Sequence, residues 1–282
     1  MTGTTPRLDV VAAVRAALLP HADPVRAAGQ QAYMKSTLPY LGLTSPVLKA
    51  TLRPVLGDPA YRISTRPEWE ATVRALWDEA THREHWYAAL TLLQHRHYRA
   101  WRDPELLPLV RHLVITGAWW DVVDEIATHV VRGLLLEWPQ TMAPTLRAWA
   151  VDEHLWIRRV AMLAQVGAGP RTDPVLLADV LVPNIPYAGE QVFFSRKAIG
   201  WALRDYARTE PDWVRAFVAA HPDVDPVRLG KLVVDATSER AHGKPRGAGR
   251  ALFRAVMAAL TAMAADPDDA ADDGDGDDAD AT

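Results

Sequence analysis

Trp120 and Asp124 are four residues apart in the run WWDVVDEIA that begins at Trp119. Side chains at this spacing lie on one face of a helix, so an aromatic ring and a carboxylate would be presented together. A carboxylate can stabilise a developing positive charge and orient water, and an aromatic face attracts cations. The alternative interpretation is a core tryptophan beside a solvated aspartate, and Asp121 is a competing carboxylate. The helix would bury an apolar stripe, namely Trp119, Val122, Val123, Ile126 and Val130.

Arg159 is the second residue that does not fit a plain core. An arginine inside an apolar stripe is costly unless it meets a carboxylate or a phosphate, so Arg159 needs an acidic partner. The alternative is an arginine at the edge of the stripe that keeps its charged head in water. Its helix neighbours three and four positions away are all apolar: Leu155, Trp156, Met162 and Leu163.

Trp201 lies on the less apolar side of a further predicted helix, with Lys197 and Arg204 as its helix neighbours. A large aromatic ring flanked by cations suits a site that holds a nucleobase beside phosphates. Tyr33 has a similarly polar setting on its own helix. Either ring could instead pack against an adjoining helix.

Helices are the elements that must position these residues. Apolar positions recur at three and four throughout the chain, and Pro, Gly and Asp separate segments of about 12 to 18 residues. The sequence therefore predicts an all-α fold. The expected helices cover residues 7–19, 23–37, 45–55, 67–80, 83–97, 103–115, 119–136, 139–149, 153–166, 173–182, 190–208, 211–220, 225–237 and 248–264.

Short turns favour antiparallel neighbours, and helix pairs recur about every 35 to 45 residues, which is typical of a HEAT-like solenoid. Such a stack has a concave face on which an extended partner can lie. We expect residues 1–242 to form this repeat domain and residues 243–264 to form a basic linker and a last helix. Residues 265–282, with nine Asp and no Lys or Arg, are expected to be a disordered acidic tail.

Composition narrows the class of protein further. The 282 residues are 49% hydrophobic, and no stretch is apolar enough to span a bilayer. Charges interrupt the apolar N-terminal segment, so we expect no secretion and a cytoplasmic location. The absence of cysteine excludes disulfides, zinc ribbons and a thiol nucleophile. Outside the acidic tail, 31 Lys and Arg face 26 of the 35 Asp and Glu, so the body is about +5, which permits an anionic partner.

Four sequence blocks occur in an order that resembles the AlkD-type alkylpurine DNA glycosylases. They are QAYMKSTLPYLGL at 31–43, WWDVVDEIA at 119–127, WIRR at 156–159 and RKAIGWALRDY at 196–206. The resemblance covers about residues 25 to 220. The chain departs from the family in the 183–189 connection, beyond residue 220 and in the acidic tail, and these departures put lesion preference in doubt more than catalysis.

The resemblance implies a concave basic face that binds duplex DNA, and hydrolysis without a metal or an organic cofactor. It assigns Asp124 as the catalytic carboxylate and Trp120 and Trp201 as the aromatic pair of the cleft. Arg159 would contact a phosphate beside the lesion, and Tyr33 would form a further aromatic wall. The cations of the matching blocks are expected to contact DNA phosphates as well: Lys35, Arg158, Arg196 and Lys197.

The expected function is release of cationic N3-alkyladenine and N7-alkylguanine, including bulky adducts, from double-stranded DNA in base excision repair. The resemblance implies that the lesion stays in the duplex and is not flipped into a pocket. We expect a monomer with no membrane partner that is associated with the nucleoid when bound to DNA. Two alternatives remain open: a self-resistance glycosylase for a natural-product adduct, and a non-catalytic helical-repeat scaffold that binds DNA or protein.

Overall fold

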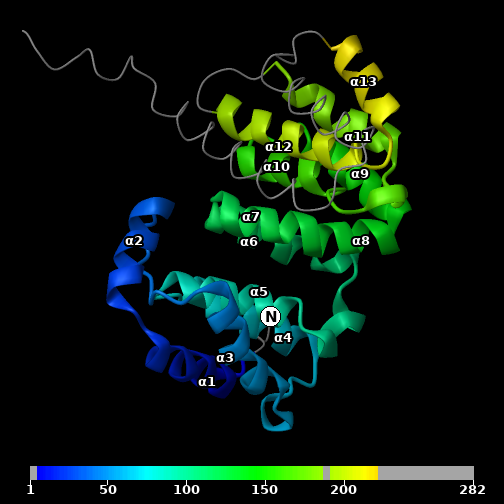
Figure 1. Cartoon of the computed structure of the whole chain (residues 1–282). Helices are drawn as coiled ribbons and strands as arrows, with labels where there is room; N and C mark the ends of the chain where they lie inside the picture. Colours follow the sequence, from blue (N-terminus) through cyan, green and yellow to red (C-terminus); the bar gives the residue numbers. More distant parts are fainter. Residues whose placement is uncertain (1–4, 187–190, 222–282) are drawn as a thin grey trace, which may run out of the picture. The chain divides into compact units, whose positions relative to one another are not determined.

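A computed structural model describes residues 5–186 and 191–221 (Figure 1). The chain divides into two units, and all the described residues belong to the first, Met1–Val233. The helices expected at 225–237 and 248–264 lie outside the described residues. So do the predicted boundary at residue 242 and the predicted acidic tail, and these remain predictions.

The described residues form an all-α structure without a strand, as the periodicity predicts. None of their helices is long and apolar enough to cross a membrane. The α-helices are α1 (Leu8–Leu18), α2 (Pro24–Met34), α3 (Ser45–Gly57), α4 (Arg66–Asp78), α5 (Arg83–Leu93), α6 (Leu107–Gly117), α7 (Trp120–Glu125), α8 (Arg132–Glu137), α9 (Pro139–Trp149), α10 (Leu155–Leu163), α11 (Pro174–Leu181), α12 (Gln191–Tyr206) and α13 (Pro211–Ala220). Short 3₁₀ turns join several of them: η1 (Leu19–His21), η2 (Pro59–Tyr61), η3 (Arg96–Trp101), η4 (Pro104–Leu106), η6 (Gly169–Arg171) and η7 (Val182–Asn184).

Local capping explains why many helices begin where they do. The Asp23 side chain accepts a hydrogen bond from the Arg26 N–H at the start of α2, and Thr65 accepts one from Glu68 N–H at the start of α4. The Asp173 carboxylate accepts two at the start of α11. Proline occupies the first turn of each of these helices, where its missing N–H costs no hydrogen bond.

The helices stack on others that are near them in the sequence and form a helical repeat. Contacts join α1 to α3, α4 to α5, α8 to α9 and α10 to both α7 and α12. A continuous core runs between these elements and contains large side chains without solvent exposure, such as Trp69, Leu113 and Ile126. The apolar stripes identified in the sequence therefore face one another.

Several predicted helices end earlier than expected, including those at 23–37 and 83–97. The helix expected at 23–37 ends at Met34, because Lys35 has a φ of 48° in the left-handed region and its N–H closes the helix on the Gln31 and Ala32 carbonyls. The helix expected at 83–97 ends at Leu93, and a separate 3₁₀ turn, η3, comes after it.

The helix expected at 119–136 is confirmed in extent but is not α-helical throughout. A π-helical turn, η5 (Ile126–Val131), separates α7 from α8. Hydrogen bonds in a π turn close five residues apart, so the turn holds an additional residue and rotates the helix beyond it. The turn begins directly after the segment that contains Trp120 and Asp124.

Candidate active site

A tight reversal positions the start of α7. Ala118 adopts a left-handed φ of 35°, an uncommon conformation for a residue with a side chain. The preceding Gly117 has no room for a side chain, because a Cβ there would lie 2.7 Å from the Trp77 ring. Trp119 is then extended, and Trp120 begins the helix. Backbone strain of this kind is maintained only where the surrounding contacts require it.

Asp124 forms a two-pronged ion pair with Arg159 of α10. Arg159 Nε donates to Asp124 Oδ1 at 2.7 Å, and Arg159 Nη2 donates to Oδ2 at 2.8 Å. The Asp124 side chain is only 14% exposed and the Arg159 side chain only 5%. Arg159 thus has the acidic partner that its apolar surroundings require, and the paired geometry offsets the cost of burying both charges.

The guanidinium of Arg159 is also held by α12. Its Nη1 donates to the Phe194 carbonyl at 2.7 Å, and the group lies 6.0 Å from the centre of the Phe194 ring. Three of the five guanidinium N–H groups are thereby used within the protein, which leaves two for another acceptor. Helices α7, α10 and α12 together fix this charge in one position.

The environment of Asp124 shifts its acidity. Burial raises the pKa of the Asp124 carboxyl above its ordinary value, the Arg159 charge and hydrogen bonds oppose that rise, and the nearby Asp121 charge adds to it. Each Asp124 oxygen accepts one hydrogen bond from Arg159, so lone pairs remain on both oxygens. A water molecule could be oriented by these lone pairs.

Asp121, the competing carboxylate, is tied to α5. It accepts hydrogen bonds from Arg83 Nη2 at 2.5 Å, Arg83 Nε at 3.3 Å and Tyr87 Oη at 2.6 Å. Tyr87 Oη lies 3.1 Å from Tyr40 Oη. Sequence spacing does not indicate this network, because Arg83 is 38 positions away from Asp121 and each contact crosses between helices.

The two tryptophans of the predicted pair each have one side against the core. Trp120 and Trp201 are half-buried and contact the apolar cluster of the described residues. Trp120 is at the first position of α7 and Trp201 is in the middle of α12, whose neighbour α10 also contacts α7. Each ring therefore keeps part of its surface accessible, Trp120 on the helix of Asp124 and Trp201 on the helix whose Phe194 carbonyl binds Arg159.

Phe194, which contacts Arg159, belongs to a cluster of four aromatic rings to which the sequence alone did not assign a functional role. The Trp119 ring centre lies 6.0 Å from that of Trp156 and 5.8 Å from that of Phe194. Phe193 and Phe194 meet edge to face at 5.1 Å. The consecutive phenylalanines before the RKAIGW block were the available signal, but only the tertiary contacts reveal the Phe194 carbonyl as an acceptor.

Lys197 is the predicted cation that lies nearest the Arg159 end. Its Nζ is 4.1 Å from the centre of the Phe193 ring. Burial lowers the pKa of the Lys197 ammonium, and the Arg159 charge lowers it further. The neighbouring Arg196 is exposed on the same helix.

The other predicted contacts are more dispersed. Tyr33 is 69% exposed on α2, and Lys35 is exposed at the end of that helix. Arg158 is only 2% exposed, and its Nη1 donates to the Asp152 and Glu153 carbonyls. Arg158 thus contacts the loop before α10, on a different side of the helix from Arg159.

Comparisons with known proteins identify the family of the chain. The family model of DNA alkylation repair enzymes matches residues 14–228, so the chain belongs to that family and is an enzyme of DNA alkylation repair. A solved structure described as a predicted DNA alkylation repair enzyme from Enterococcus faecalis is 26% identical with a TM-score of 0.64. The match covers 77% of this chain and 95% of that one. No curated protein matches.

Proposed function

We propose that this chain is a monofunctional DNA glycosylase that hydrolyses the N-glycosidic bond of cationic N3-alkyladenine and N7-alkylguanine in duplex DNA. The observation that carries the proposal is the buried Asp124–Arg159 pair between α7 and α10, with Trp120 on α7 and Trp201 on α12, which contacts α10. Membership of the alkylation repair family supplies the class of substrate.

Cationic alkylpurines set the chemical demand on the site. Alkylation at N3 or N7 gives the base a positive charge, so the base leaves as a neutral molecule without a strong general acid. The deoxyribose instead acquires oxocarbenium character as the C1′–N bond breaks. A negative charge beside the sugar is therefore the main requirement, and Asp124 supplies one.

In the proposed reaction, Asp124 stabilises the developing charge on the sugar and orients a water molecule through its remaining lone pairs. The water oxygen forms the new bond to C1′ as the bond to the base nitrogen breaks. The proton lost by the water passes to Asp124 and then to solvent. Trp120 and Trp201 would attract the cationic base and sugar through their ring faces, worth roughly 1 to 2 kcal/mol per contact.

Arg159 would serve both the carboxylate and the DNA. Its contacts with Asp124 and the Phe194 carbonyl keep the guanidinium fixed, and its two remaining N–H groups can reach a phosphate oxygen beside the lesion. Lys197 and Arg196 on α12 would add positive charge along the DNA strand that carries this phosphate. Retention of the lesion within the duplex is part of this proposal and places no pocket-volume limit on the adduct.

Single-turnover base release tests the proposal. Duplexes containing N7-methylguanine, N3-methyladenine, a bulky cationic adduct or uracil are incubated with the wild type and Asp124→Asn, and the released bases are separated by chromatography. We expect release of the cationic bases by the wild type, loss of release by Asp124→Asn and no release of uracil. A matched control is Asp179→Asn, which removes a surface partner of Arg147 at 2.7 Å and should leave the rate unchanged.

Three results would contradict the proposal. Wild-type rates in Asp124→Asn would assign the catalyst elsewhere, and efficient uracil release would remove the requirement for a cationic base. Activity on methylated bases but not on bulky ones would show that a closed pocket limits the adduct.

A further inference from the structure

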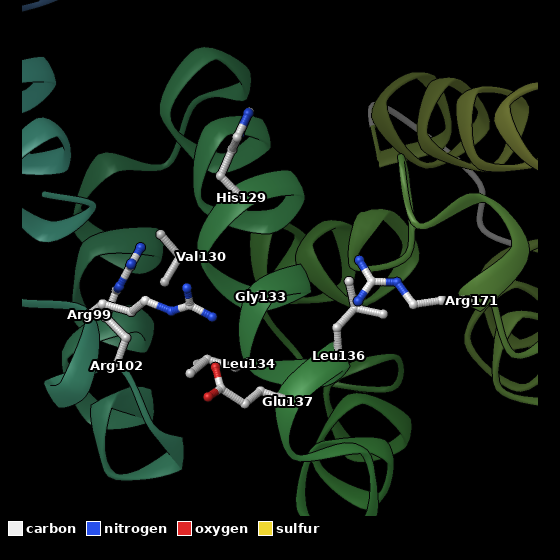
Figure 2. A pocket seen from close by; sticks show the side chains of 9 residues that line it. All are labelled: Arg99, Arg102, His129, Val130, Gly133, Leu134, Leu136, Glu137 and Arg171. Carbon is white, nitrogen blue, oxygen red and sulfur yellow. The ribbon is translucent and has the colours of Figure 1, made fainter. Parts of the chain in front are cut away.

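A cavity of about 390 Å³ lies at the other end of the helical run that begins with Trp120 (Figure 2). It is formed by three stretches of the first unit: η3 and the residue after it, the helix from η5 into α8, and the turn η6. The residues that matter chemically are Arg99, Arg102, His129, Glu137 and Arg171.

Positive charge in this cavity exceeds negative charge. Arg99, Arg102 and Arg171 contribute three guanidinium groups, against one carboxylate from Glu137. Within the part of the chain that the structure describes, these three guanidinium groups form no hydrogen bond or ion pair. Arg66, Arg83 and Arg159, by contrast, each bind a carboxylate.

Arg102 has the clearest need of an anion among the three arginines. Its Nε is buried and has no hydrogen-bond partner among the described residues. Burial lowers the pKa of the Arg102 guanidinium and the neighbouring Arg99 charge lowers it further, while the Glu137 charge opposes this shift without reversing it. A buried donor without an acceptor destabilises the folded protein, and an entering anion that accepts from it would remove that cost.

Gly133 forms the part of the cavity surface between the arginines. Figure 2 shows Arg99 and Arg102 approaching the helix on one side of Gly133 and Arg171 on the other. A Cβ at Gly133 would meet nothing within 4 Å, so internal contacts do not require glycine. Glycine inside a helix is less favourable than alanine, and close approach of a ligand to the backbone would explain its presence.

We propose that this cavity is a phosphate-binding site and that it takes a backbone phosphate of the DNA held at Asp124. The DNA source of the phosphate rests on the proposed function. Nine residues separate Asp124 from Gly133, about 13 Å along a helix axis, and one DNA strand carries about four phosphates over that length. In this proposal the duplex at Asp124 runs along α7 and α8, which would bring one of these phosphates to the cavity.

The test measures binding of undamaged duplex by fluorescence anisotropy across a series of NaCl concentrations. The variant Arg99→Gln/Arg102→Gln/Arg171→Gln should lower the slope of log affinity against log salt by about one, which corresponds to roughly tenfold weaker binding at 0.1 M salt. Arg96→Gln is the matched control, because Arg96 is an exposed arginine of η3 that does not line the cavity. Its slope should equal that of the wild type.

Gly133→Ala separates binding from folding. The added methyl group should raise the melting temperature through helix propensity and should weaken duplex binding by narrowing the approach to the backbone. A higher melting temperature with unchanged affinity for the duplex would show that the backbone at Gly133 does not take part in phosphate binding. A melting curve shows whether the triple variant is folded. If it is not, the double variant Arg99→Gln/Arg171→Gln, which changes only exposed side chains, takes its place in the same measurements.

Inorganic phosphate distinguishes the two sources of the ligand. Thermal stabilisation of the wild type by phosphate, lost in the triple variant, together with the altered salt slope supports the proposal. Phosphate stabilisation with an unchanged slope overturns the DNA source. If neither measurement distinguishes the triple variant from Arg96→Gln, the site itself is overturned. If the wild type binds no duplex, the proposed function fails, and phosphate stabilisation alone decides whether this cavity binds phosphate.

Discussion

Two aspartates of α7, Asp121 and Asp124, each form an ion pair with an arginine of another helix. The two pairs differ in what surrounds them. Asp121 and Arg83 are 12% and 5% exposed, and Asp124 and Arg159 are almost equally buried. Tyr87 donates a third contact to Asp121 and closes its second oxygen, whereas the Asp124 oxygens meet only Arg159 among the described residues. At equal burial, Asp121 therefore accepts three hydrogen bonds and Asp124 only two, so Asp124 keeps more unused acceptor sites.

This comparison suggests different tasks for similar pairs. The Asp121 pair joins α7 to α5 and includes the Tyr40–Tyr87 contact, so its principal effect should be on stability. The Asp124 pair joins α7 to α10 and α12, and its principal effect should be on base release. Substitutions at the two pairs should separate these effects.

The largest expected effect comes from Asp124→Asn. The substitution removes the charge that faces the sugar while preserving shape, so single-turnover base release should fall at least about a thousandfold, roughly 4 kcal/mol of transition-state stabilisation. Duplex affinity, measured by anisotropy, should stay equal or increase because a charge that repels phosphate is lost. A comparable rate loss in Asp121→Asn, at equal folded fraction, would remove the distinction between the two pairs.

Arg83→Gln should have the second-largest effect, and it should appear in stability. The change leaves the Asp121 charge buried without its cation, which costs about 3 kcal/mol. Denaturant unfolding monitored by tryptophan fluorescence would measure the loss. The base-release rate per folded molecule should remain within a few fold of the wild type, and Arg74→Gln on the surface of α4 provides the matched control.

Arg159→Gln should move the pH dependence of activity. Arg159 lowers the pKa of Asp124 against the larger effect of burial, so its neutralisation raises that pKa further. Asp124 would then stay protonated to a higher pH, and the acid limb of kcat/KM should move upward in pH. Arg159→Lys keeps the charge and should keep the limb nearer its wild-type position. An unmoved limb in Arg159→Gln would assign the titration to another group.

Tyr87→Phe should give the smallest effect. It removes one hydrogen bond to Asp121 and leaves the Arg83 pair intact, so stability should fall by about 1 kcal/mol with no change in the base-release rate. Parallel unfolding and rate measurements would show this. Any change in the pH profile would indicate that the Asp121 network also controls the Asp124 charge.

The sequence was informative wherever a feature is local. Helix positions can be inferred from apolar spacing and from caps such as Asp23 and Asp173, and the Trp120–Asp124 pair from helical geometry. The need of Arg159 for an acidic partner is likewise evident from its immediate neighbours. These properties depend on a few consecutive residues, so no tertiary knowledge is needed to infer them.

Other features depend on contacts between distant segments. The partners of Asp121 lie on α5, and the Phe194 carbonyl that holds Arg159 lies on α12. Arg158 and Arg159 look equivalent in the sequence, yet only Arg159 reaches the carboxylate, because adjacent helix positions face different neighbours. The π turn has no sequence signature that hydrophobic periodicity can detect, since its flanking helices continue the same apolar stripe.

The π turn changes the rotation of α8 about the helix axis relative to α7. A residue added to an α-helix changes the direction of everything beyond it by about 100°, and the turn at 126–131 absorbs one such step without breaking the helix. Gly133 and Glu137, which lie beyond the turn in α8, therefore face a direction that an uninterrupted α-helix from Asp124 would not give. Deletion of a single residue from this turn should leave α7 and α8 folded but should rotate one relative to the other. The two helices would then face different parts of a partner's surface.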